Sequence, residues 1–136
     1  MLDAFLVCPN TIVATKGDST PLDISPAESR VFLLTLSITA VIEQESLEIS
    51  LFTSTDGTTW EPKAAASLPQ KFYVGEYPLL LDLTAAPGAK FVRAHWELAR
   101  WGRGATEPRF EFGLRLREVP QQELIEARAE AAQRRD

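Results

Sequence analysis

Strict alternation of apolar and polar residues is the sequence feature that most constrains the fold of this chain. Between Ser29 and Glu43, every second residue from Phe32 to Ile42 is apolar, while the centre of the other parity is polar. Successive side chains of a β-strand point to opposite faces, so this period of two predicts a strand with one face in a hydrophobic core. The same alternation predicts further strands at 47–54, 79–84, 90–101 and 109–119.

Shorter strand candidates bring the total to about eight, which is typical of an antiparallel sandwich. They lie at Asp3–Val7, Thr11–Thr15 and Pro21–Ile24, with turn formers at Pro9-Asn10 and Lys16–Asp18 between them. No helical pattern of about ten residues lies between the strands, which disfavours a parallel βαβ arrangement. We therefore predict an all-β fold, an antiparallel β-sandwich or jelly roll over residues 1–119.

A C-terminal helix is predicted to follow the sandwich over residues 120–136. After Pro120 almost every residue is a strong helix former, and Pro120 itself suits a first helical position. The apolar stripe of this helix is thin, because Leu124 and Ile125 are followed only by alanines. A helix of about 15 residues is marginal alone in water, so it needs a surface to lie against. Two alternatives stay open: the tail packs on its own sandwich or frays, or it docks on a neighbouring subunit.

Composition excludes several classes of protein. One cysteine, Cys8, and one histidine among 136 residues cannot form an intrachain disulfide or a structural zinc site. A formal net charge of −5 argues against a nucleic-acid binder. The first residues lack the basic region of a secretory signal, and the longest apolar-rich stretch, 31–42, is too short to span a membrane. We therefore expect no membrane span, and a cytoplasmic location or a place in an assembled particle.

A turn motif ends the strand predicted at 47–54. Ser54, Asp56, Gly57 and Trp60 form the pattern Ser-x-Asp-Gly-x-x-Trp. Glycine adopts a positive φ at low cost and aspartate accepts hydrogen bonds from nearby backbone amides, so the motif predicts a tight turn over which Trp60 folds back. The hairpin resembles one in discoidin-like (coagulation factor 5/8 C-type) β-sandwiches, which are commonly extracellular carbohydrate- or lipid-binding modules. The resemblance implies a sandwich fold, and it adds carbohydrate binding as an alternative function.

The sequence does not predict an enzyme. The one histidine, His95, shares a predicted strand face with Arg93 and Glu97, where a positioned cation or a hydrogen bond is its ordinary explanation. The nucleophile-elbow, phosphate-loop and zinc-helix motifs of common enzymes do not occur. Scattered acidic residues could hold calcium, but no spacing demands it. We predict no catalytic residue, no cofactor and no metal.

Charge is distributed unevenly along the chain. Residues 1–60 carry two basic and eight acidic side chains, whereas residues 90–117 carry seven basic and three acidic ones. If the two strands of the second region pair, their arginines and glutamates form a cross-strand ladder. The alternative is an electropositive sheet face that meets the acidic half of another copy of the chain. The interface candidates are Arg93, Arg100, Trp101, Arg103, Arg109, Arg115 and Arg117, with Leu124 and Ile125 from the tail.

These observations favour a non-catalytic structural or interaction module. We expect a β-sandwich subunit that forms a homo-oligomer or docks on a larger assembly, such as a particle, an appendage or a virion-like structure. The alternative is a carbohydrate-binding module with a glycan as its ligand. Its aromatic side chains would come from connecting segments, including a long loop predicted over Leu68–Pro78. The candidate ligand-binding residues are Trp60, Phe72, Tyr73 and Tyr77.

Overall fold

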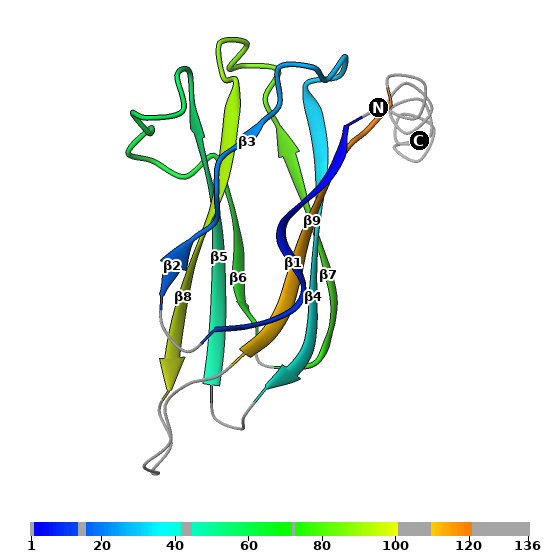
Figure 1. The fold of residues 1–136 in the computed structure, drawn as a ribbon, viewed down its shortest axis with the longest axis vertical. Helices are drawn as coiled ribbons and strands as arrows, with labels where there is room; N and C mark the ends of the chain where they lie inside the picture. Colours follow the sequence, from blue (N-terminus) through cyan, green and yellow to red (C-terminus); the bar gives the residue numbers. More distant parts are fainter. Residues whose placement is uncertain (1, 14–15, 42–44, 72, 101–109, 121–136) are drawn as a thin grey trace, which may run out of the picture.

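Antiparallel β-strands in two sheets make up the structure. The computed structural model describes residues 2–13, 16–41, 45–71, 73–100 and 110–120. These residues contain nine strands and no helix, which confirms the predicted all-β fold. Figure 1 shows the sheets as two layers that face each other. The helix predicted after Pro120 falls on residues 121–136, which lie outside the described residues.

Two sheets, which we call A and B, differ in strand number. Sheet A has four strands in the order β1-β9-β4-β7. They are β1 (Asp3–Val13), β4 (Val31–Val41), β7 (Gly75–Asp82) and β9 (Phe110–Glu118). Sheet B has five strands in the order β2-β8-β5-β6, and β3 also pairs with β8. They are β2 (Gly17–Asp18), β3 (Leu22–Asp23), β5 (Glu45–Ser54), β6 (Ala66–Lys71) and β8 (Phe91–Arg100).

The hydrophobic core lies between the sheets and takes one face of each. Every second residue of β4 from Phe32 to Ile38 is at most 2% exposed, as the alternation predicts. Their counterparts on β9 are Phe110, Phe112, Leu114 and Leu116, and sheet B contributes Leu47, Ile49, Leu51, Val92 and Ala94. Burial of each large apolar side chain stabilises the fold by about 1.5–3 kcal/mol. This shared core fixes which face of each strand remains outside.

Two predictions about the connections are wrong. The turn expected at Pro9-Asn10 is an irregularity within β1, which continues to Val13. Asn10 has a φ of 62°, a conformation that asparagine tolerates, so the strand is not interrupted there. The long loop expected over Leu68–Pro78 contains most of β6 and the start of β7, and the short connection between them passes from sheet B to sheet A. Its prolines argue against strands in the sequence, but both lie on edge strands, where a missing N–H costs no ladder hydrogen bond.

Proline lies at each edge of the sandwich. In sheet A the edge strands β1 and β7 carry Pro9 and Pro78. In sheet B the edge strand β6 carries Pro69, and Pro21 lies between β2 and β3 at the other edge. Proline cannot donate to a β-ladder, so such edges resist pairing with a strand from another chain. Association of this protein by extension of either sheet is therefore disfavoured.

The irregular part of β1 passes close to β9 on the outer side of sheet A. A Cβ atom at Gly113 of β9 would lie 2.9 Å from the Cα atom of Pro9. Real Cβ atoms almost never approach a neighbour so closely, and the neighbour here is backbone, which moves less readily than a side chain. Gly113 therefore permits the passage of β1 that shapes this end of the outer face.

Substitution of Gly113 by alanine is expected to destabilise the protein by about 1–3 kcal/mol, the usual cost of overpacking. The added methyl group would force β1 away from β9, and urea unfolding would measure the loss. The matched control is Gly88→Ala, because a Cβ atom there would meet only Thr55 Cγ2 at 3.8 Å, an ordinary contact. We expect the control to change stability by less than about 0.5 kcal/mol. Equal stability of the two variants would contradict the close approach of β1 to β9 at Gly113.

Candidate functional site

The outer face of sheet A carries most of the exposed apolar side chains. In the described part of the chain, five large hydrophobic side chains are more than half exposed. Phe5, Ile12 and Leu80 are 52%, 58% and 56% exposed, and each pairs in register with an outward residue of β9 or β4. The other two, Tyr73 and Val74, lie between β6 and β7. Sheet B has no such side chain on the part of its outer face that the structure describes.

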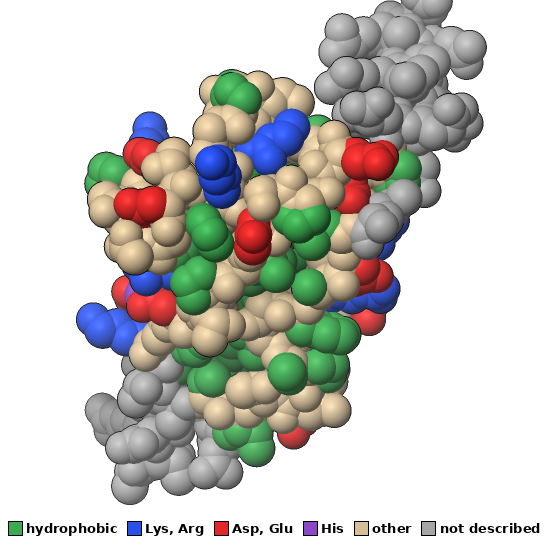
Figure 2. Space-filling view, turned by 45° about the horizontal axis from the view of Figure 1, so that its top comes forward, with side chains coloured by type: hydrophobic (Ala, Val, Ile, Leu, Met, Phe, Trp, Pro, Cys, Tyr) green, Lys and Arg blue, Asp and Glu red, His purple; other side chains and the backbone are tan. Residues whose placement is uncertain are grey.

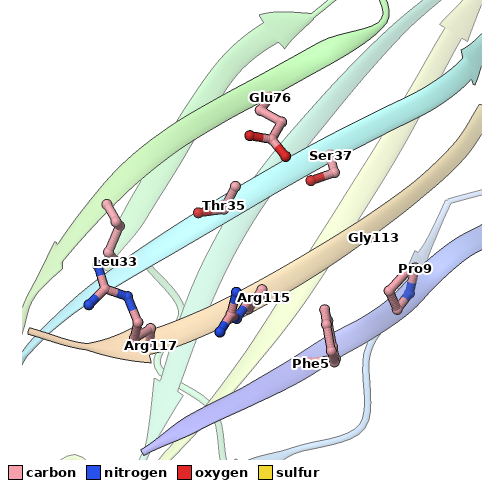
Figure 3. A pocket seen from close by; sticks show the side chains of 9 residues that line it. All are labelled: Phe5, Pro9, Leu33, Thr35, Ser37, Glu76, Gly113, Arg115 and Arg117. Atoms are coloured by element: carbon pink, nitrogen blue, oxygen red, sulfur yellow. The ribbon is translucent and has the colours of Figure 1, made fainter.

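A shallow groove of about 400 Å³ runs over the outer face of sheet A. Figure 3 shows that all four strands of the sheet contribute to its lining. The lining residues are Phe5 and Pro9 of β1, Leu33, Thr35 and Ser37 of β4, Glu76 of β7, and Gly113, Arg115 and Arg117 of β9. The groove therefore combines an exposed aromatic ring with hydroxyl groups and with charges of both signs.

Charged groups on this face are partly neutralised within the chain. The Arg115 guanidinium donates two hydrogen bonds to the Asp3 carboxylate, one of them 2.7 Å from Nε to Oδ1. These hydrogen bonds lower the pKa of Asp3, although partial desolvation opposes the effect. Further along the face, Thr39 Oγ1 donates to Glu111 Oε2 over 2.8 Å. Asp3, Arg115 and Glu111 therefore have hydrogen-bond partners within the chain.

A different arrangement occupies the outer face of sheet B, where His95 of β8 joins two carboxylates. His95 Nδ1 lies 2.8 Å from Asp18 Oδ1 on β2, and Nε2 lies 3.1 Å from Glu97 Oε1. Partial burial lowers the pKa of His95, but hydrogen bonds with Glu97 and Asp18 outweigh it, and the net shift is upward. The neighbouring Arg93 places its guanidinium 4.5 Å from the centre of the Trp60 ring. The histidine thus fastens the two-residue strand β2 to the centre of the sheet.

The hairpin motif that contains Trp60 forms the local structure predicted from the sequence. Gly57 has a φ of 82°, and Asp56 Oδ1 accepts hydrogen bonds from the amides of Thr59 and Thr58 at 2.8 and 2.9 Å. These hydrogen bonds hold the pKa of Asp56 well below its usual range. Ser54 pairs with Trp60 in an isolated bridge, which returns the indole towards sheet B. The turn therefore uses Asp56 and Gly57 for its own stability and presents Trp60 beside β8.

The structure does not bring the predicted arginine cluster together. Arg93 lies on sheet B, whereas Arg115 and Arg117 lie on the outer face of sheet A, because β8 and β9 belong to different sheets. The cross-strand ladder and the single electropositive face are therefore wrong. Strands β1 and β2 pair with β9 and β8, so Asp3 meets Arg115 and Asp18 meets His95 within one chain. Figure 2 accordingly shows acidic and basic side chains interspersed on the visible face.

The remaining interface candidates have no described environment. Arg100 is the last residue of β8. Trp101, Arg103, Arg109, Leu124 and Ile125 lie outside the described residues. Docking of the tail in cis or in trans therefore stays a prediction.

The candidate ligand-binding aromatics lie at opposite ends of the sandwich. Trp60 lies in the β5–β6 connection, at the end where Leu51 pairs with Ala66. Tyr73 and Tyr77 lie near the other end, beyond the pairing of Leu47 with Lys71, and Figure 1 shows the distance between the two connections. Phe72 lies outside the described residues. Trp60 consequently shares no binding surface with Tyr73 and Tyr77, although it has polar neighbours of its own.

Sequence reasoning missed the apolar residues that distinguish the outer face of sheet A. Leu80 belongs to the parity opposite the buried Leu81, and Phe5 faces outward just before the register of β1 shifts at the buried Leu6 and Val7. The sequence did contain a signal for this face: in the run Leu79–Leu81 the outward residue, Leu80, is also apolar. The partnership of His95 with Asp18 was not predictable, because the two residues are 77 positions apart.

Comparisons with known proteins do not assign the chain to a family. No family model matches it, and no curated protein matches it. Where the structure describes the chain, no helix is long and apolar enough to cross a membrane. In the same residues, no group of three or more His, Cys, Asp or Glu side chains is arranged to hold a metal ion. We therefore argue function from the two outer faces of the sandwich.

The raised pKa of His95 predicts a loss of stability as pH rises. A group whose pKa is higher in the folded state stabilises the fold fully below its unfolded value, about 6.5, and loses this contribution as pH rises through the folded value. Between pH 5.5 and 8.5 the melting temperature should therefore fall further for the natural protein than for His95→Gln, which cannot take up the proton. The matched control Thr20→Val leaves His95 in place and should keep the full pH dependence. An identical pH dependence in His95→Gln would contradict the bridge from His95 to Asp18 and Glu97.

Proposed function

We propose that this chain is a non-catalytic interaction module, a β-sandwich that self-associates through the outer face of sheet A. The observation that carries the proposal is the exposure of Phe5, Ile12 and Leu80 on one face, at 52%, 58% and 56%. Interfaces are enriched in aromatic residues and arginine, and this face adds Arg115 and Arg117 to its apolar side chains. A second copy of the chain is the occupant that the face fits best.

Burial of the three apolar side chains supplies the driving force. Full burial of one large apolar side chain is worth about 1.5–3 kcal/mol, so covering the exposed half of each would contribute roughly 1 kcal/mol. A two-fold interface uses the same patch in both copies, so each of these residues contributes twice. Polar side chains of the face need no new partners where they are already paired, as Asp3 is with Arg115.

Charge and edge structure favour a second copy over strand addition. The face carries Asp3, Glu76 and Glu111 together with Arg115 and Arg117, so it can complement its own charges in a two-fold arrangement. Prolines at the sheet edges disfavour pairing through the backbone. If sheet A of one copy packs face to face on sheet A of a second copy, opposite charges can meet and no sheet edge has to pair.

The dimensions of the face indicate weak, reversible association. Four strands about 4.8 Å apart, with 9 residues in β9 at about 3.4 Å each, give an area of roughly 600 Å². A standard specific interface buries about 800 Å² on each partner. We therefore expect a monomer–dimer equilibrium in the micromolar range. Growth into a particle or appendage would need a second contact, since a two-fold interface closes on itself.

Leu80→Glu is expected to shift the equilibrium strongly towards monomer. The substitution places a carboxylate among the apolar side chains of the proposed contact twice per dimer, and sedimentation velocity between about 5 and 300 µM would measure a dissociation constant at least about tenfold higher. The matched control is Val74→Glu, which makes the same kind of change at a side chain 59% exposed in the β6–β7 turn. A natural protein that stays monomeric over this range, or equal effects of the two variants, would overturn the proposal.

A further inference from the structure

A hollow on the outer face of sheet B has the composition of a ligand site. It is an open depression of about 390 Å³ beside the β5–β6 connection, on the opposite layer from the groove of sheet A. Its lining includes Asp18, Phe52, Trp60, Glu61, Arg93 and His95. The hollow thus combines two aromatic side chains with hydrogen-bond donors and acceptors from β2, β5, β8 and the β5–β6 connection.

Arg93 is the principal donor of the hollow. Its guanidinium lies 4.5 Å from the centre of the Trp60 ring, a cation–π arrangement that orients the planar fork. The Nε atom is buried 4.0 Å from Asp18 Oδ1, while the side chain as a whole is 30% exposed. A ligand in the hollow would therefore meet the exposed part of the guanidinium, whose planar N–H groups can donate to it.

Hydrogen-bond acceptors also line the hollow. The carboxylate of Asp18 is 44% exposed although it also bonds His95, and Glu61 is exposed at the rim. A phosphate or another strong anion would meet both carboxylates and be repelled. A ligand whose groups both donate and accept hydrogen bonds would satisfy Arg93 and the carboxylates together.

We propose that this hollow binds a saccharide. Sugar hydroxyl groups donate to carboxylates and accept from a guanidinium, and the C–H groups of a pyranose ring pack against aromatic side chains such as Trp60 and Phe52. Ligand pockets generally combine an apolar lining with a few placed polar groups in this way. The saccharide site and the association face lie on opposite layers of the sandwich, so one chain can use both.

A glycan array probed with the labelled full chain, followed by NMR titration of the best glycan, tests the proposal. We expect saturable binding that shifts the indole N–H resonance of Trp60. Arg93→Lys keeps the charge but loses the planar fork, and Glu61→Gln keeps the shape but loses the charge. Each should weaken binding by about tenfold, the equivalent of one charge-assisted hydrogen bond. Glu61→Gln keeps the test valid if Arg93→Lys does not fold.

Two controls separate this proposal from self-association. Lys63→Gln changes a charged residue exposed two positions from Glu61, outside the lining of the hollow, and should leave the affinity unchanged. Leu80→Glu should dissociate the dimer while the glycan still binds. Absence of binding to every glycan on the array would overturn the saccharide site, as would a glycan bound equally well by Arg93→Lys and Glu61→Gln.

Discussion

Burial of one face of each sheet against the other is the constraint on which the rest of this structure depends. The inward residues of β4 and β9, among them Phe32, Leu36 and Phe112, are almost fully buried against sheet B. Once their parity is fixed, every intervening residue must face outward, because a strand cannot turn single side chains independently. The chemistry of the two outer faces is therefore a direct consequence of the core.

The two outer faces differ because the sequence fills their positions differently. Sheet A presents Phe5, Ile12 and Leu80 to solvent from its two edge strands, β1 and β7. Sheet B presents a connected polar group in which His95 bridges Asp18 and Glu97. We infer association on the first face and a saccharide on the second, and neither surface contributes residues to the other.

Periodicity alone predicted the all-β fold and most of the strands. It succeeded for β4, β5, β8 and β9, which have one buried face and no proline. It failed for β6 and the start of β7, where Pro69 and Pro78 are compatible with strands only because those strands lie at edges. Edge position is a property of the whole sheet, so no local pattern reveals it.

Charge along the sequence was a poor guide to charge on the surface. The acidic first half and the arginine-rich region of 90–117 are distant in the chain, but the pairing of β1 with β9 and of β2 with β8 brings them together. The contacts of Asp3 with Arg115 and of Asp18 with His95 therefore neutralise charges that the sequence places far apart. Only the strand order, which periodicity does not determine, could have shown this.

Hydroxyl-radical footprinting at increasing protein concentration tests the central claim most directly, because it reports the exposure of individual side chains without any substitution. Oxidation of Phe5, Ile12 and Leu80 should fall as the concentration rises from about 1 to 300 µM, the range in which we expect the dimer to form. Tyr73, which is 74% exposed in the β6–β7 turn, serves as an internal reference and should keep its reactivity. If Phe5 and Leu80 are oxidised equally at all concentrations, or if Tyr73 is protected in their place, the outer face of sheet A is not the surface through which this protein associates.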